Sequence, residues 1–230
     1  MALIGISGYS GAGKDTVGRV IQYLECRNTG SVPINEAIHA EHDWWMEEQS
    51  GWEIKKFAGK LKQIASILTG ISIEKFEDQK FKKTKLGPEW SYTKFDYYRG
   101  SSTNPREVDM TVRDFLQKLG TESLRTELHE NVWLNALFAD YTPDSNWIIT
   151  DVRFPNEAES IKSRGGIIIR VDRPGLKALN DHPSEKSMDD YKYDYRIINS
   201  SSLDNLMPVV GTILQREKLT QHAQLQNNNS

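Results

Sequence analysis

A glycine-rich loop near the N-terminus constrains this chain more than any other feature of its sequence. The loop (residues 8–16) reads Gly-Tyr-Ser-Gly-Ala-Gly-Lys-Asp-Thr, and it follows a short apolar run at residues 3–7. Apolar residues then recur at helical spacing over residues 17–24. A glycine loop between a strand and a helix lets backbone N–H groups turn toward an anion, and the helix N-terminus adds a partial positive charge. The sequence therefore predicts a phosphate-binding loop of the Walker A type, in which Lys14 supplies the mobile cation.

The residue after Lys14 departs from the commonest pattern of such loops. Most of them carry a serine or threonine whose hydroxyl contacts magnesium, whereas this chain has Asp15 there and places Thr16 one position later. Two interpretations of Asp15 stay open: it approaches magnesium through water or orients the surroundings of an acceptor phosphate, or it is a favourable acid in the first turn of a helix. Asp15 and the lack of an Asn-Lys-x-Asp motif argue against a GTPase switch. A metabolite kinase is favoured.

The rest of the chain alternates strand-like and helical segments. Strands are predicted at residues 147–150, 167–171 and 197–198, and helices are predicted over residues 57–68, 112–119, 133–138, 157–164 and 203–214. This alternation predicts an α/β protein with a parallel sheet covered by helices on both faces, as in the three-layer P-loop NTPase fold. Residues 28–52 show no convincing period, so we expect a loop there with one helix at most.

Lysines and aromatic residues interleave between about residues 73 and 108, which indicates a lid-like insertion over the core. On one interpretation this insertion is a lid that closes over the phosphates and excludes water, with Arg99 or Arg106 reaching the transferring group. On the other it is a solvated, charged loop. We expect a single domain over residues 1–220 that includes this insertion, followed by a disordered polar tail at residues 221–230.

Composition narrows the classes of protein that the chain can belong to. The formal net charge of −3 argues against a stable nucleic-acid partner or an anionic membrane surface. No apolar stretch approaches membrane-spanning length. Cys26 is the single cysteine of the sequence, so no internal disulfide can form, and the five histidines show no zinc-binding spacing. We expect a reducing, cytoplasmic setting.

A second cluster of charged residues follows the strand predicted at residues 147–150. Asp151 stands at the edge where ligands bind in an open parallel sheet, and Arg153 and Glu157 follow at short offsets. A charged Asp-x-Arg at this edge can organise magnesium or a catalytic water and present a guanidinium fork to an acceptor phosphate. The alternative is an N-cap and a surface ion pair on the next helix.

In combination, several blocks of this sequence resemble the phage deoxynucleoside monophosphate kinases. The blocks are Gly-x-x-Gly-x-Gly-Lys-Asp-Thr, Phe57-Ala58-x-x-Leu61-Lys62, the segment of residues 112–122 with Trp133 downstream, Asp151-Val152-Arg153-Phe154-Pro155-Asn156-Glu157-Ala158, Arg173-Pro174-Gly175, His182-x-Ser184-Glu185 and Ile198-Asn199. The resemblance extends from about residue 3 to residue 214 and is weak across residues 28–52 and 80–108. It implies transfer of the γ-phosphoryl group of ATP to a deoxynucleoside monophosphate (dNMP), which gives the diphosphate (dNDP) and ADP.

The resemblance also implies roles for individual residues and leaves a homodimer open. Residues of the glycine loop would hold ATP, with Thr16 near magnesium: Gly8, Gly11, Ala12, Gly13, Lys14, Asp15 and Thr16. The acceptor would be bound by Arg113, Trp133, Asp151, Arg153 and Glu157. The catalytic residues would be Lys14, Asp15, Asp151 and Arg153. Trp133 would stack on the acceptor base or belong to the core of a helix, and Arg113 would bind the acceptor or lie on the surface.

Two other functions stay open on the sequence alone. A dephospho-coenzyme A kinase or another small-metabolite P-loop kinase would share the phosphate loop and the parallel sheet, although the block at residues 151–158 favours the deoxynucleotide family. A nucleotide-binding or single-strand DNA-binding module would use the lysines and aromatic residues of residues 80–106 to stack bases. The acidity of the chain and its full phosphate loop argue against that module. The sequence does not indicate which bases are accepted or whether ribose forms are excluded.

Overall fold

The computed structural model describes residues 2–27, 32–39, 42–95, 97–98, 101–102, 105–142, 144–177, 186–200 and 202–219. The chain divides into two compact units, which we call the sheet unit (Met1–Phe57 and Leu137–Ser230) and the insert unit (Ala58–Ala136). Among the described helices, none combines the length and the hydropathy needed to span a bilayer.

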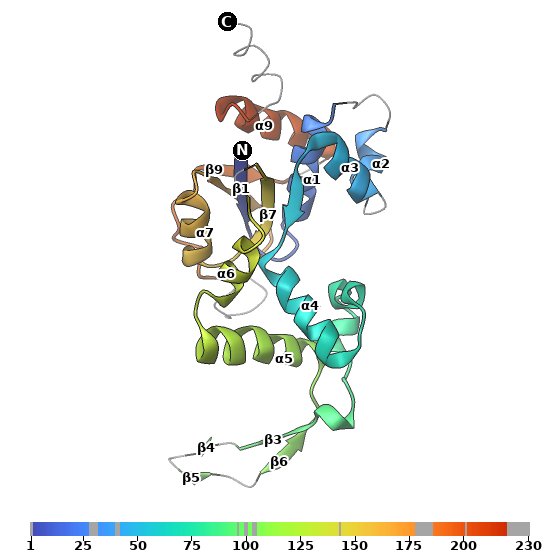
Figure 1. The fold of residues 1–230 in the computed structure, drawn as a ribbon, viewed down its shortest axis with the longest axis vertical. Helices are drawn as coiled ribbons and strands as arrows, with labels where there is room; N and C mark the ends of the chain where they lie inside the picture. The colour runs from blue at the N-terminus through green and yellow to red at the C-terminus, as the bar shows by residue number, and fades with distance from the viewer. Residues whose placement is uncertain are drawn as a thin grey trace, which may run out of the picture. The chain divides into compact units, whose positions relative to one another are not determined.

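The sheet unit is built around five parallel strands (Figure 1). They are β1 (Ala2–Ser7), β2 (Glu53–Lys55), β7 (Asn146–Val152), β8 (Ile167–Asp172) and β9 (Tyr195–Ile198). Their spatial order is β2-β7-β1-β8-β9, and every neighbouring pair is parallel. From β1 the chain moves to one edge of the sheet, and from β7 it later crosses to the other side of β1. The carboxyl ends of β1 and β7 therefore form the point where the strand order reverses, which is where open α/β sheets bind ligands.

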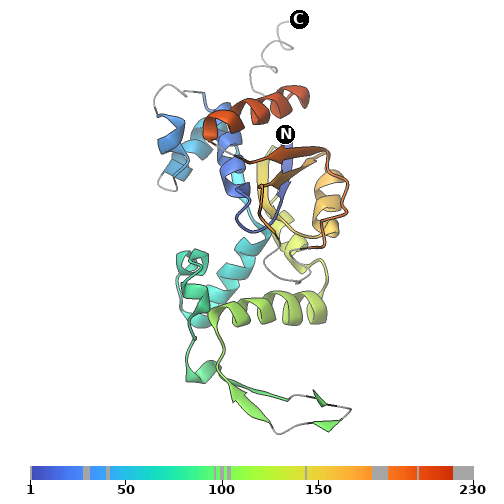
Figure 2. The same cartoon turned by 180° about the vertical axis from the view of Figure 1, so that it is seen from behind.

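Helices cover both faces of this sheet, as the two opposite views show (Figures 1 and 2). On one face, α1 (Lys14–Glu25) and α9 (Leu203–Arg216) share an apolar core with inward side chains of the strands, such as Ile4 and Ile169. On the other face lies α7 (Pro155–Lys162), whose Ile161 approaches β1 closely at Gly5. The two short helices α2 (Ile34–Ala37) and α3 (Asp43–Ser50) lie beside α1. The predicted three-layer α/β fold is confirmed.

The insert unit combines helices with short antiparallel hairpins. Its elements are α4 (Phe57–Thr69), η2 (Ile73–Glu77), η3 (Phe81–Lys83), η4 (Pro88–Trp90), β3 (Tyr92–Lys94), β4 (Tyr97–Tyr98), β5 (Ser101–Ser102), β6 (Arg106–Val108), α5 (Val112–Gln117), η5 (Lys118–Leu128) and α6 (Val132–Phe138), of which α4 and α6 extend across the unit boundaries. Strands β3 and β6 pair with each other, as do β4 and β5. A small core forms around Phe76, Val112 and Phe115. The insertion predicted at about residues 73–108 falls within this unit, and its action as a lid stays a prediction.

Three details of the sheet unit differ from the sequence-based description. Strand β2 was not expected, because three residues without an apolar run give no local signal and its formation depends on pairing with β7. The described part of residues 28–52 holds two helices, α2 and α3, where at most one was expected. Strand β7 continues through Asp151 to Val152 instead of ending at Thr150. Arg99, the His-x-Ser-Glu block at residues 182–185 and the predicted tail at residues 221–230 lie outside the described residues.

Candidate active site

The glycine loop connects β1 to α1 at the carboxyl edge of the sheet, and two of its glycines lie where no side chain fits. Gly13 has φ 94° and ψ 27°, and a Cβ atom there would lie 2.3 Å from the side-chain nitrogen of Asn199. A Cβ atom at Gly8 would lie 2.4 Å from the carbonyl oxygen of Val171. The loop therefore packs its backbone directly against the ends of β8 and β9, and only glycine permits this at both positions.

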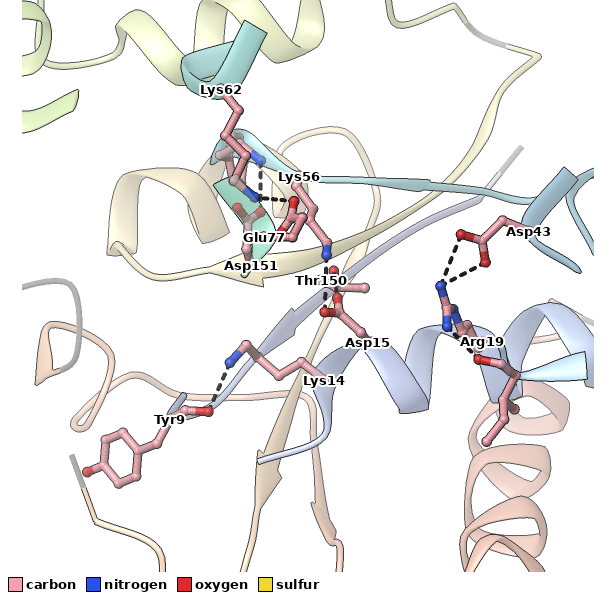
Figure 3. Close-up of polar contacts among 12 residues, drawn as sticks. Tyr9, Lys14, Asp15, Arg19, Asp43, Lys56, Lys62, Glu77, Thr150 and Asp151 are labelled. Carbon is pink, nitrogen blue, oxygen red and sulfur yellow. Dashed lines mark hydrogen bonds and ion pairs between the residues drawn. The ribbon is translucent and has the colours of Figure 1, made fainter. Parts of the chain in front are cut away.

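Lys14 and Asn199 bond to backbone carbonyls of the glycine loop. The Nζ atom of Lys14 donates to the carbonyl oxygen of Gly8 at 2.8 Å and to that of Tyr9 at 2.9 Å; Figure 3 shows the bond to Tyr9. Asn199, directly after β9, donates its side-chain N–H to the carbonyl oxygen of Ala12 at 2.9 Å. These bonds tie three carbonyl oxygens of the loop to side-chain donors, and the Ala12 N–H donates to the Tyr9 carbonyl oxygen at 3.1 Å within the loop.

Asp15 joins the first turn of α1 to the ends of two strands. Its Oδ1 accepts a hydrogen bond from the hydroxyl of Thr150 on β7 at 2.5 Å, and its Oδ2 lies 3.1 Å from Nζ of Lys56, which directly follows β2 (Figure 3). Partial desolvation raises the pKa of Asp15, but the charge of Lys56 and the hydrogen bond from Thr150 outweigh it and hold the pKa below its usual value. Asp15 is therefore ionised at neutral pH. Thr16 follows on the same turn of α1.

Asp151 and Glu157 both accept hydrogen bonds from backbone amides. Asp151 is 7% exposed, and its Oδ1 accepts from the N–H of Phe57 at 2.8 Å, at the start of α4. Glu157 is 2% exposed, and its Oε2 accepts from the N–H groups of Arg153 at 2.9 Å and Phe154 at 3.2 Å. Glu157 thus caps the start of α7, whereas Asp151 bonds to the start of α4, and the expected roles of Asp151 and Arg153 toward an acceptor stay predictions.

The register of the sheet brings both predicted clusters to one edge. Ser7 pairs with Val152, so the start of the glycine loop and the turn that carries Arg153 leave the sheet side by side. The sheet unit thus gathers most of the predicted site residues at the carboxyl ends of β1, β2 and β7: Lys14, Asp15, Thr16, Asp151, Arg153 and Glu157.

Two predicted acceptor residues, Arg113 and Trp133, belong to the insert unit and have partners within it. Arg113 is exposed on α5 and donates to the side-chain oxygen of Gln79 at 3.0 Å. Trp133 is 5% exposed, and its indole N–H donates to the carbonyl oxygen of Gly120 at 2.7 Å. Burial and a satisfied indole N–H are typical of a tryptophan in a core, the alternative to base stacking.

Two residues that contact Tyr9 of the glycine loop, Arg170 and Asp189, were missed from the sequence. The guanidinium carbon of Arg170 lies 4.6 Å from the ring centroid of Tyr9, and the Tyr9 hydroxyl donates to Asp189 at 2.8 Å. This hydrogen bond is the main cause that raises the pKa of Tyr9. Arg170 is 5% exposed and donates from Nε to Asp172 at 2.9 Å. The sequence could have revealed Arg170 by its position within an apolar strand, because a buried arginine needs partners.

Comparison with known proteins places the chain among nucleotide kinases. Residues 61–210 match the family described as deoxynucleotide monophosphate kinase. The deoxynucleoside-5'-monophosphate kinase of Escherichia phage T5 is 29% identical over 238 residues, which cover 89% of this chain and 92% of the T5 protein.

Two further relatives carry the name of the matched family, deoxynucleotide monophosphate kinase. An Acanthamoeba polyphaga mimivirus protein, provisionally named a deoxynucleotide monophosphate kinase, is 27% identical over 218 residues, covering 89% of this chain and 91% of its own. The deoxynucleotide monophosphate kinase of Enterobacteria phage T4 is 27% identical over 117 residues, covering 49% of this chain and 48% of its own. Because the family match spans more than half of the sequence, the chain belongs to the deoxynucleotide monophosphate kinase family of phosphotransferases.

Proposed function

We propose that this kinase transfers the γ-phosphoryl group of ATP to a dNMP, with release of ADP and a dNDP. The observation that carries the proposal is the glycine loop at the carboxyl end of β1, beside the turn at Arg153 after β7. An anion-binding loop and a guanidinium at one sheet edge can hold a donor and an acceptor phosphate near each other.

The donor phosphates would bind to the amide groups of the glycine loop and the N-terminus of α1. Lys14 would exchange its two bonds to the carbonyl oxygens of Gly8 and Tyr9 for bonds to phosphate oxygens. Bonds between an ammonium and an anion are stronger than bonds to neutral carbonyls, so the exchange favours the nucleotide complex. The carbonyls that it releases lie at the start of the loop, next to β1.

The acceptor phosphate would bind to Arg153, whose guanidinium offers a planar fork of donors. Glu157 would support this role indirectly, because it holds the backbone N–H of Arg153 at 2.9 Å and thereby fixes the turn from which that side chain extends. Asp151 would fix the same edge through its bond to the Phe57 amide. Arg113 and Trp133 would contribute to acceptor binding from the insert unit, as the family resemblance implies.

The oxygen atoms at this edge suit a magnesium ion held mainly by the nucleotide. Magnesium keeps several water molecules and needs only one or two protein oxygens when phosphates supply the rest. Over the described part of the chain, no three His, Cys, Asp or Glu side chains form a metal-binding group by themselves, in keeping with a phosphate-bound ion. The Thr16 hydroxyl would hold the ion, directly or through water. When bound, magnesium would neutralise charge on the phosphate oxygens.

The protein contributes positioning and charge to such a transfer and needs no covalent intermediate. Lys14 and Arg153 would neutralise the donor and acceptor phosphates. A cover over the carboxyl edge of the sheet would exclude water from the transferring group. The lysines and aromatic residues of about residues 73–108 would provide the cover, as a lid.

An acceptor panel tests the proposal. ADP release from ATP would be followed with each of the four common deoxynucleoside monophosphates, their ribose counterparts and dephospho-coenzyme A. We expect ADP release that depends on at least one dNMP. Release with dephospho-coenzyme A and none with any dNMP would reject the proposal in favour of the metabolite-kinase alternative. Salt-sensitive binding to single-stranded DNA without any acceptor-dependent release would favour the binding-module alternative.

A further inference from the structure

We propose that Lys56 is a positioning residue of the donor site, where it neutralises the carboxylate that this chain carries directly after the glycine-loop lysine. The inference rests on the proposed function of the glycine loop as the ATP site. Lys56 belongs to no motif of the sequence, and its pairing with Asp15 determines how the charge of that unusual carboxylate acts on ATP.

The geometry fixes Asp15 from two sides. Thr150, which is 1% exposed on β7, donates its hydroxyl to one carboxylate oxygen of Asp15 at 2.5 Å. Lys56 approaches the other oxygen to 3.1 Å. The position of Lys56 is itself set by the sheet, because it follows Lys55, which pairs with Ile149 on β7. Both partners therefore reach Asp15 from adjacent strand ends, and the carboxylate bridges α1 to the sheet edge (Figure 3).

The charge of Asp15 creates a problem for a polyphosphate ligand. Asp15 stands next to Lys14 in the first turn of α1, at the helix end that would bind the donor phosphates. An aspartate carboxylate is ordinarily negative at neutral pH, and the ammonium of Lys56 lies 3.1 Å from this one. Like charges a few ångström apart repel each other, and a bare carboxylate here would weaken the attraction that the helix N-terminus and Lys14 provide. With Lys56 in place, the pair has no net charge.

Fold stability alone does not explain this ion pair. The side chain of Asp15 is 58% exposed and that of Lys56 is 30% exposed, so solvent screens their attraction. Exposed ion pairs of this kind contribute little to folding. The pair instead lies where one uncompensated charge acts directly on an anionic ligand, and this location is what makes Lys56 matter.

The decisive experiment compares ATP binding and turnover in three variants. Lys56→Met leaves Asp15 uncompensated, so we expect the KM for ATP to rise about tenfold, with kcat within about twofold of wild type. Asp15→Asn/Lys56→Met removes both charges and keeps the shape of the Asp15 side chain. The double variant should bind ATP with a lower KM than Lys56→Met, because no uncompensated carboxylate remains beside the donor phosphates.

Lys55→Met is the matched control. The ammonium of Lys55 pairs with Glu53 on the same strand at 2.5 Å, so its loss changes the net charge of the chain equally but leaves the Asp15 pair intact. We expect its KM for ATP to match wild type. Thermal unfolding of every variant separates a folding defect from a binding defect.

Salt provides a readout that a purely structural role would not move. The affinity penalty of Lys56→Met, measured by titration with a non-hydrolysable ATP analogue, should shrink as ionic strength rises, because salt screens the exposed carboxylate. An unchanged KM in Lys56→Met would overturn the inference. So would a double variant as weak as Lys56→Met, which would show that Lys56 contacts the phosphates directly. If wild type neither binds the analogue nor turns over ATP, the proposed function fails first, and this outcome is distinct from both.

Discussion

Replacing Gly13 with alanine should distort the glycine loop by an amount that the structure defines. Gly13 has φ 94°, a backbone conformation that costs a residue with a side chain about 1–2 kcal/mol. The new methyl would also lie 2.3 Å from the side-chain nitrogen of Asn199, far inside contact distance. Asn199 would have to move and lose its bond to the Ala12 carbonyl, which adds about 1 kcal/mol.

The sum predicts that Gly13→Ala lowers the free energy of unfolding by about 2–3 kcal/mol. Chemical denaturation followed by circular dichroism measures this, and Gly59→Ala is the matched control. A Cβ atom at Gly59 on α4 meets nothing within 4 Å, so that variant should be neutral or more stable by up to about 1 kcal/mol.

A second substitution tests whether the clash with Asn199 contributes to the loss of stability in Gly13→Ala. If the clash with Asn199 is real, Gly13→Ala/Asn199→Ala should be less destabilised than the sum of the two single variants, because truncating Asn199 opens the space. Strict additivity would show that the clash contributes nothing. A Gly13→Ala variant with wild-type stability and wild-type ATP affinity would refute the account of the loop as a whole.

Three other predictions concern Lys14, Arg153 and Cys26. Lys14→Ala should lower kcat/KM at least about 100-fold while thermal unfolding stays near wild type, and wild-type activity would remove Lys14 from the donor site. Arg153→Lys should raise the KM for the acceptor about tenfold and leave the KM for ATP nearly unchanged, since an ammonium cannot reproduce the guanidinium fork; equal effects on both substrates would contradict this role. Burial raises the pKa of the Cys26 thiol to about 11, so iodoacetamide at pH 8 should label it only after denaturation, and rapid labelling of the folded protein would show that the thiol is accessible.

The parts of the site that could be predicted from sequence are those with a local signal. The glycine loop is one continuous stretch between a strand and a helix, and Asp151 and Arg153 follow an apolar run, so their place at the sheet edge was predictable. Glu157 was expected to bind the acceptor and to begin the next helix, whereas α7 begins at Pro155 and Glu157 stands at its third position as a capping residue. Its two backbone hydrogen bonds follow from that spacing.

Contacts between distant segments could not be predicted in this way. The pairing of Lys56 with Asp15 depends on β2, a strand of three residues that forms only against β7. The stacking of Arg170 on Tyr9 likewise requires β8 to lie beside β1. A single sequence gives strand positions but not strand order, so it cannot say which side chains from separate strands meet at the edge.

The hydrogen bond between Asp151 and the Phe57 amide has a consequence for ligand chemistry. That amide belongs to the first turn of α4, where backbone donors lack partners within the helix. A ligand that drew Oδ1 of Asp151 to itself would strand a buried donor, at a cost of about 1–3 kcal/mol. Any substrate or hydrated cation that pulled this oxygen away from the Phe57 amide would be bound more weakly by that amount. Asp151 is therefore better suited to hold the start of α4 against the sheet edge than to act as a mobile general base.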